Sequence, residues 1–178
     1  MGKLVHGGRV YANVNHSNYP IANSMVFDGS TYFELPISMT SDHKITVVFE
    51  ATTAAQNDSA IWATADNACY LVIYNNQWYV TQGTGIDAHF GSADTNEHTL
   101  VYNDGNGHTL FDGQVVANCT PRNSAHYKLG VRNVNKFIGK IKSFRVESIS
   151  TGDLIFEVLP STSNKILMYG NIDNMVTE

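Results

Sequence analysis

Charged residues are scarce in this 178-residue chain, at 15% of the sequence, and bases are scarcer than acids, with 11 Lys and Arg against 16 Asp and Glu. The formal net charge is −5. Proteins that hold nucleic acid by its phosphates need clustered Lys and Arg. The densest basic stretch, with Lys136, Lys140, Lys142 and Arg145, follows an alternating pattern typical of a solvated strand face. Nucleic acid is therefore not an expected partner.

Long apolar runs and metal-binding motifs are also missing. No apolar stretch approaches the roughly 20 residues that span a bilayer, so membrane insertion is not expected. Residues 1–8 lack the apolar region of a secretory signal, so no such signal is expected there. The histidines form neither H-x-H nor H-E-x-x-H, which argues against zinc. The sequence leaves open whether Cys69 and Cys119 form a disulfide.

The pattern that does recur is alternation with a period of two. In residues 44–51, Ile45, Val47 and Phe49 alternate with polar side chains, as in a half-buried strand. About a dozen such segments are separated by Gly, Asn and Asp, and none shows a sustained helical repeat. With 43% hydrophobic residues, the chain can bury the core of one domain. These features predict an all-β fold, a two-sheet antiparallel sandwich or a barrel.

Turn residues define hairpins and a distinct N-terminal segment. Asn75-Asn76, residues 104–107 and Asp112-Gly113 each predict a tight turn between two strands. Pro36 is expected to end the strand over residues 31–35. Residues 1–22 are more polar than the rest, so we interpret them as an N-terminal arm with one short strand over 9–14. Residues 23–178 then form the sandwich domain.

Five segments resemble, in order, those of concanavalin A-like (laminin-G-like) jelly-roll domains. They are FDGSTYFEL at 27–35, ITVVFE at 45–50, EHTLVYNDG at 97–105, TLFDGQVV at 109–116 and FIGKIKSFRV at 137–146. The resemblance extends across residues 24–159, most of the chain, and implies a two-sheet antiparallel sandwich of that kind. It does not specify a function, because such folds host many activities.

The two ends of the chain carry a narrower resemblance. GDLIFEVLP at 152–160 and ILMY at 166–169 are similar to laminin-G-like domains of bacteriophage and prophage structural proteins, and KLVHGGRVY at 3–11 is similar to leaders of phage tail and fibre proteins. This likeness implies a non-enzymatic virion accessory protein, such as a capsid or tail decoration or a fibre head. Such a protein would be assembled in the host cytoplasm and exposed on the particle surface. Residues 1–22 would then contact other virion proteins in a homo-oligomer such as a trimer. The alternative is a free-standing extracellular lectin or carbohydrate-binding module.

Aromatic residues gather around the first predicted turn. Tyr70 and Tyr74 share one strand face, and Trp78 and Tyr79 follow the turn. Aromatic faces stack on sugar rings, and neighbouring amides can hydrogen-bond to hydroxyls. The alternative is that Trp62 and half of the tyrosines belong to the core, and for Trp78 and Tyr74 both interpretations stay open. The predicted glycan site comprises Tyr70, Tyr74, Asn75, Asn76, Trp78 and Tyr79.

Catalysis and cofactors receive little support. Glycanases on this fold carry an E-x-D-x-x-E strand, which places an acid and a nucleophile in one cleft. The chain has no such motif, and Glu34 opposite Glu50 is the remaining arrangement for a glycanase, the least favoured function. Calcium, which prefers oxygen ligands, is the one cofactor considered, although Asp is also a common turn residue. The candidate ligands are Asp66, Asp94 and Asp104.

Overall fold

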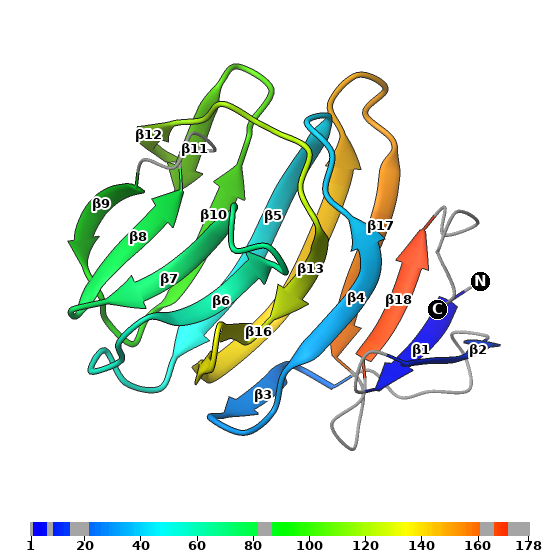
Figure 1. Ribbon diagram of the computed structural model, residues 1–178, viewed down its shortest axis with the longest axis horizontal. Helices are drawn as coiled ribbons and strands as arrows, with labels where there is room; N and C mark the ends of the chain where they lie inside the picture. Colours follow the sequence, from blue (N-terminus) through cyan, green and yellow to red (C-terminus); the bar gives the residue numbers. More distant parts are fainter. Residues whose placement is uncertain (1, 7–8, 15–21, 82–86, 161–165, 171–178) are drawn as a thin grey trace.

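A computed structural model describes residues 2–6, 9–14, 22–81, 87–160 and 166–170, and every regular element in these ranges is a β-strand. No helix in these ranges is long and apolar enough to cross a membrane. The described strands form two sheets (Figure 1). The larger contains, in spatial order, β12 (Gln114–Asn118), β11 (His108–Phe111), β10 (Glu97–Tyr102), β5 (His43–Ala51), β16 (Ile138–Ser148), β17 (Leu154–Pro160), β18 (Ile166–Gly170), β1 (Gly2–His6) and β2 (Arg9–Val14), with β3 (Met25–Asp28) also pairing β16.

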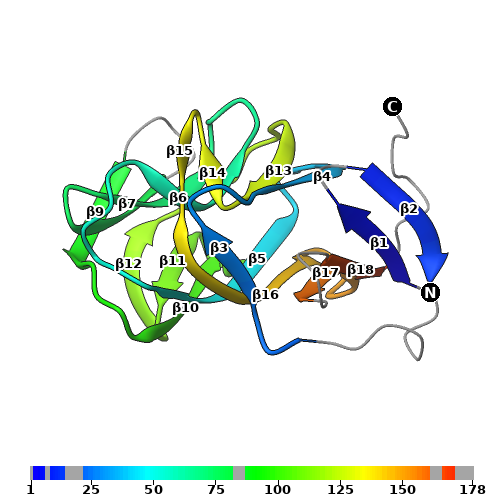
Figure 2. The same cartoon turned by 90° about the horizontal axis from the view of Figure 1, so that it is seen from below.

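The second sheet faces the first across the core. Its order is β14 (Val131–Arg132), β15 (Asn135–Lys136), β6 (Ser59–Thr64), β7 (Tyr70–Tyr74), β8 (Gln77–Thr81) and β9 (Asp87–Ser92), while β13 (His126–Leu129) pairs β6 and β4 (Phe33–Ser38). Pairing is antiparallel throughout the described strands except at Lys136, which lies parallel to Ala60. The two layers are visible edge-on in Figure 2, where the β14–β15 hairpin stands on the outer side of the second sheet. The predicted two-sheet antiparallel sandwich is therefore confirmed.

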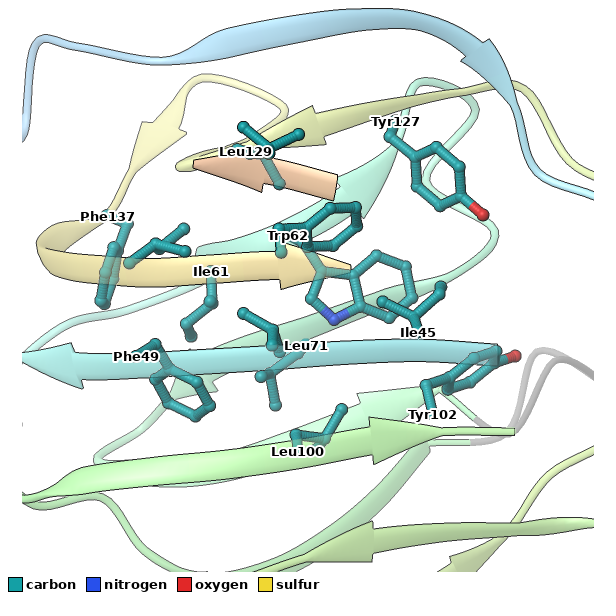
Figure 3. Close-up of a cluster of buried hydrophobic side chains, with 14 of the residues drawn as sticks. Ile45, Phe49, Ile61, Trp62, Leu71, Leu100, Tyr102, Tyr127, Leu129 and Phe137 are labelled. Carbon is teal, nitrogen blue, oxygen red and sulfur yellow. The ribbon is translucent and has the colours of Figure 1, made fainter. Parts of the chain in front are cut away.

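The core lies between the two layers because each sheet turns one set of alternate side chains inward. β5 alternates buried and partly exposed residues along its whole length, as its sequence predicts. Phe49 of β5 and Trp62 of β6 are both fully buried and come from opposite sheets (Figure 3). The ring of Trp62 packs edge-on against Tyr102 with centroids 5.4 Å apart, a geometry that aromatic pairs favour.

The turns follow the predicted chemistry. Asn75 and Asn76 have φ values of 49° and 61°, so the β7–β8 hairpin has two consecutive left-handed residues, which Asn tolerates. Pro36 does not end its strand, which corrects the prediction. β4 continues to Ser38 because the register shifts between His126 and Tyr127 of β13, leaving Pro36 without an opposite residue. β4 lies at the edge of the described sheet, where proline is tolerated.

The N-terminal segment contains the predicted strand, β2, over Arg9–Val14. It also contains β1, which the sequence did not reveal. β1 pairs antiparallel with β18 and with β2, so both strands extend the larger sheet. In Figure 2 they curl from the plane of β17 and β18 toward β4. Contacts of residues 1–22 with other proteins, and the domain boundary after residue 22, stay predictions.

Both cysteines are free thiols in the core. The hydroxyl of Tyr102 donates to the Sγ atom of Cys69 at 3.7 Å. Burial raises the pKa of the Cys69 thiol to about 11, so this side chain stays protonated and unreactive in the folded protein.

Candidate functional site

Trp78 lies in the core, which removes it from the predicted glycan site. Its side chain is 2% exposed and packs edge-on against Phe49, with ring centroids 5.4 Å apart. It also contacts the ring of His98 at 5.6 Å. A side chain so enclosed cannot stack on an external ligand. Alternation along β8 explains the outcome, because Trp78 and Val80 face inward while Tyr79 faces outward.

The three tyrosines lie together on the outer face of the second sheet. Alternation places Tyr70, Val72 and Tyr74 on the outer face of β7, and Tyr79 opposes Val72 across the hairpin. The rings of Tyr74 and Tyr79 meet at 87° with centroids 5.6 Å apart. Tyr74 is 41% exposed. Part of the predicted aromatic cluster therefore forms a surface feature.

Tyr70 is covered rather than open to solvent. The guanidinium of Arg132 lies over its ring, 3.8 Å from the ring centre. Arg132 belongs to the β14–β15 hairpin, which pairs with β6 through Lys136 and Ala60, and Ala60 and Ala63 are fully buried beside Tyr70 in the same cluster. Tyr70 therefore supports the arginine and offers no free face for stacking.

Two carboxylates, those of Asp58 and Asp87, fix the stacked pair of Arg132 and Tyr70. The Nη1 atom of Arg132 donates to Oδ1 of Asp58 in a short ion pair whose side chains are about one-fifth exposed. The hydroxyl of Tyr70 donates to Oδ1 of Asp87 at 2.5 Å, across the intervening strand β8. Burial, and then the hydrogen bond to Asp87, raise the pKa of the Tyr70 hydroxyl well above its usual value, so it remains a donor.

A pocket opens beside these groups. It is lined by Val72, Tyr74, Tyr79, Asp87 and Arg132 and has a volume of about 270 Å³. Small-molecule sites typically measure roughly 300–1,000 Å³, so this pocket suits about one ring. It combines an apolar floor and two aromatic rings with one carboxylate and one guanidinium.

The sequence missed Asp87 and Arg132. Alternation of Ile86, Ala88 and Phe90 could have placed Asp87 on the outer face, next to the aromatic hairpin. No local signal marks Arg132, because it is 62 residues away from Tyr70 and belongs to a two-residue strand.

Asn75 and Asn76 have a conformational role in the structure. Both are exposed at the β7–β8 turn, where their left-handed backbone closes the hairpin. The carbonyl of Asn76 accepts a hydrogen bond from the amide of Ala93 at 2.8 Å. Neither residue lines the pocket, so the turn orients Tyr74 and Tyr79 without contributing amides to the same cavity.

The three candidate calcium ligands lie in separate loops. Asp66 accepts from the hydroxyls of Thr64 and Ser124 at 2.7 and 2.6 Å. The carboxylates of Asp94 and Asp104 each cap their own turn, accepting from the backbone amide two residues later.

Among the described residues, no group of three or more His, Cys, Asp or Glu could hold a metal ion. The hydrogen bonds that these aspartates make with nearby amides and hydroxyls are those typical of turn residues.

Glu34 and Glu50 cannot form an acid pair. Glu34 lies on β4 of one sheet and Glu50 on β5 of the other. Each pairs instead with a lysine of a neighbouring strand: Glu34 with Lys128 at 3.2 Å, and Glu50 with Lys140 at 2.9 Å. The glycanase arrangement considered from the sequence is therefore wrong.

No protein-family model and no curated protein matches the chain. Among solved structures, domains LG4-5 of the mouse laminin α1 chain are 18% identical, with a TM-score of 0.48, over 72% of this chain and 42% of theirs. A Bacteroides ovatus protein, provisionally described as carbohydrate-binding, is 12% identical with a TM-score of 0.51 over 85% of this chain and 59% of its own.

At these identities the likeness concerns the fold alone, and it agrees with the predicted concanavalin A-like sandwich. The chain spans about half the length of the two matched structures. Neither of them is described as part of a virion, so the phage resemblance gains no support here.

Proposed function

We propose that this chain is a carbohydrate-binding domain, and that the pocket between the β7–β8 hairpin and the β14–β15 hairpin holds the sugar. The observation that carries the proposal is the composition of the pocket. Two tyrosine rings, Tyr74 and Tyr79, stand beside one carboxylate and one guanidinium in a cavity the size of a single ring. Sugar rings present apolar C–H faces that pack on aromatic side chains and hydroxyls that bind charged groups.

The Bacteroides ovatus structure supports the same class of function. It shares the fold across most of this chain and is described as carbohydrate-binding. This likeness favours the lectin or carbohydrate-binding module over a purely structural role. A position on a virion, with residues 1–22 in contact with neighbouring proteins in a homo-oligomer, is compatible with sugar binding but has no separate observation in its favour.

We further propose binding without hydrolysis. Glycoside hydrolases place two carboxyl groups on either side of the scissile bond. Asp87 is the one carboxylate lining the pocket among the described residues. The other nearby carboxylate, Asp58, is occupied by Arg132 and by the Nδ2 atom of Asn135 at 3.4 Å. This pairing leaves Asp58 unsuited to serve as a second catalytic acid or base.

The test is a binding screen of the purified chain on immobilised glycans, with Tyr74→Ala as the site variant. Tyr32→Ala is the matched control, because Tyr32 is 42% exposed and lies outside the pocket. We expect the wild type and the control to bind the same glycan, and Tyr74→Ala to lose at least tenfold in affinity, about 1.4 kcal/mol. Unchanged binding by Tyr74→Ala would place the site elsewhere.

A further inference from the structure

The charges around the pocket form one connected chain. Asp58 pairs with Arg132, Arg132 covers Tyr70, and Tyr70 donates to Asp87. The two carboxylates and one guanidinium sum to a net charge of −1. The positive charge of Arg132 is therefore already compensated before any ligand arrives.

Hydrogen-bonding capacity nevertheless remains on both charged groups. Among the described contacts, Asp87 uses only Oδ1, so its second oxygen can accept a hydrogen bond. Arg132 uses Nη1 for Asp58, and its Nη2 atom makes no hydrogen bond among the described residues. A guanidinium carries five N–H donors, so Arg132 keeps donors that a ligand hydroxyl can use. The pocket thus offers one acceptor and unused guanidinium donors next to two aromatic rings.

We infer that the pocket selects an uncharged sugar ring and disfavours acidic sugars, an inference that rests on the proposed function. Hydroxyl groups both donate and accept, so a neutral ring can donate to Asp87 and accept from Arg132 at once. A carboxylate or sulfate would compete with Asp58 for Arg132 and would meet the negative charge of Asp87. Like charges held close together in a partly buried site repel strongly.

The test compares sugar pairs that differ only in charge. The probes are immobilised glucose and glucuronate, galactose and galacturonate, and N-acetylglucosamine and its 6-sulfate, each measured at 50 and 500 mM NaCl. We expect the preferred ring to be neutral, with its acidic counterpart at least tenfold weaker, and the neutral affinity to change less than twofold with salt. Recognition of an exposed anion would instead weaken as salt screens it.

Outcomes of the screen separate the inference from the proposed function. Equal or tighter binding of an acidic member would overturn the inference and leave the proposed function standing. An absence of binding to every probe would overturn the proposed function itself.

The variant that tests this site is Asp87→Asn. Asp87 is exposed, and asparagine keeps the size of its side chain while removing its charge. We expect this variant to lower the affinity for the neutral ring about tenfold. We also expect it to narrow the difference in affinity between the neutral and the acidic member of each sugar pair. If the difference were unchanged in this variant, Asp87 would not be the group that excludes acidic sugars, and the inference would fail.

Discussion

The guanidinium of Arg132 lies 3.8 Å from the centre of the Tyr70 ring and covers the face that a ligand would otherwise reach. This contact joins the β14–β15 hairpin to β7 of the same sheet. Its consequence is a division of roles among the tyrosines. Tyr70 fixes the arginine and Asp87, while Tyr74 and Tyr79 provide the rings that line the pocket.

Replacement of Trp78 and of Tyr74 by alanine should affect stability very differently. Trp78→Ala empties a fully enclosed position in the core, and loss of a large buried aromatic side chain costs about 3–5 kcal/mol. Tyr74→Ala removes a partly exposed ring and should cost less than about 1 kcal/mol. Urea denaturation measures both values. Similar costs for the two variants would contradict the assignment of Trp78 to the core and Tyr74 to the surface.

The ion pair between Arg132 and Asp58 should be energetically coupled. In a double-mutant cycle, Arg132→Met and Asp58→Asn should each lower the unfolding free energy by about 1–3 kcal/mol, because each leaves a partly buried partner unsatisfied. The double variant should lose less unfolding free energy than the two single variants lose together, with a coupling energy above about 1 kcal/mol.

Lys142 and Glu97 form the comparison pair, because their side chains are 38% and 51% exposed. Exposed pairs typically contribute about 0–1 kcal/mol. Equal coupling in the two cycles would show that the pair beside the pocket has no special role.

Acid should destabilise the protein through His43. Burial lowers the pKa of this ring to about 4, against the opposing effect of Asp42. Its Nδ1 atom accepts a hydrogen bond from the amide of Thr40 at 3.3 Å, which requires the neutral ring, and lies 2.7 Å from the hydroxyl of Tyr127.

Between pH 6.5 and pH 4 the unfolded chain binds a proton that the folded chain does not, so stability falls as the pH falls. The free energy of unfolding lost over this pH range is on the order of 3 kcal/mol. Urea denaturation across this range should show the slope, and His43→Gln should reduce it. An unchanged slope in the variant would assign the acid sensitivity to other groups.

Alkali should destabilise the protein through His98. Burial lowers the pKa of this ring, but hydrogen bonds from its two nitrogens to Asp112 at 2.7 Å and Asp94 at 2.9 Å outweigh burial and raise it. A histidine with a raised pKa contributes stability below about pH 6.5 that is lost as the pH rises through the folded value.

Denaturation at pH 6.0 and 8.5 measures this effect, and His98→Gln should remove the difference. Together with His43, this predicts maximal stability near pH 6.5. A steady increase in stability up to pH 8.5 would contradict the role assigned to His98.

The architecture could be predicted from the sequence because period-two alternation and turn residues are local signals. The strand over 44–51 and the Asn75-Asn76 turn both appear as expected. The burial of Trp78 could not be predicted, because an alternating strand does not say which of its faces meets the opposite sheet. The position of Arg132 over Tyr70 depends on how a distant hairpin folds back, and no nearby residue signals it.

The most direct test of the proposed site is a map of backbone amide chemical shifts as the glycan preferred in the screen is titrated in. Binding in the pocket predicts the largest changes at Val72, Tyr74, Tyr79, Asp87 and Arg132, with small changes at Trp78 of the same hairpin. Changes concentrated instead at the turns around Asp66 and Asp104, with the pocket amides unmoved, would contradict the account and move sugar binding to the loops of the sandwich.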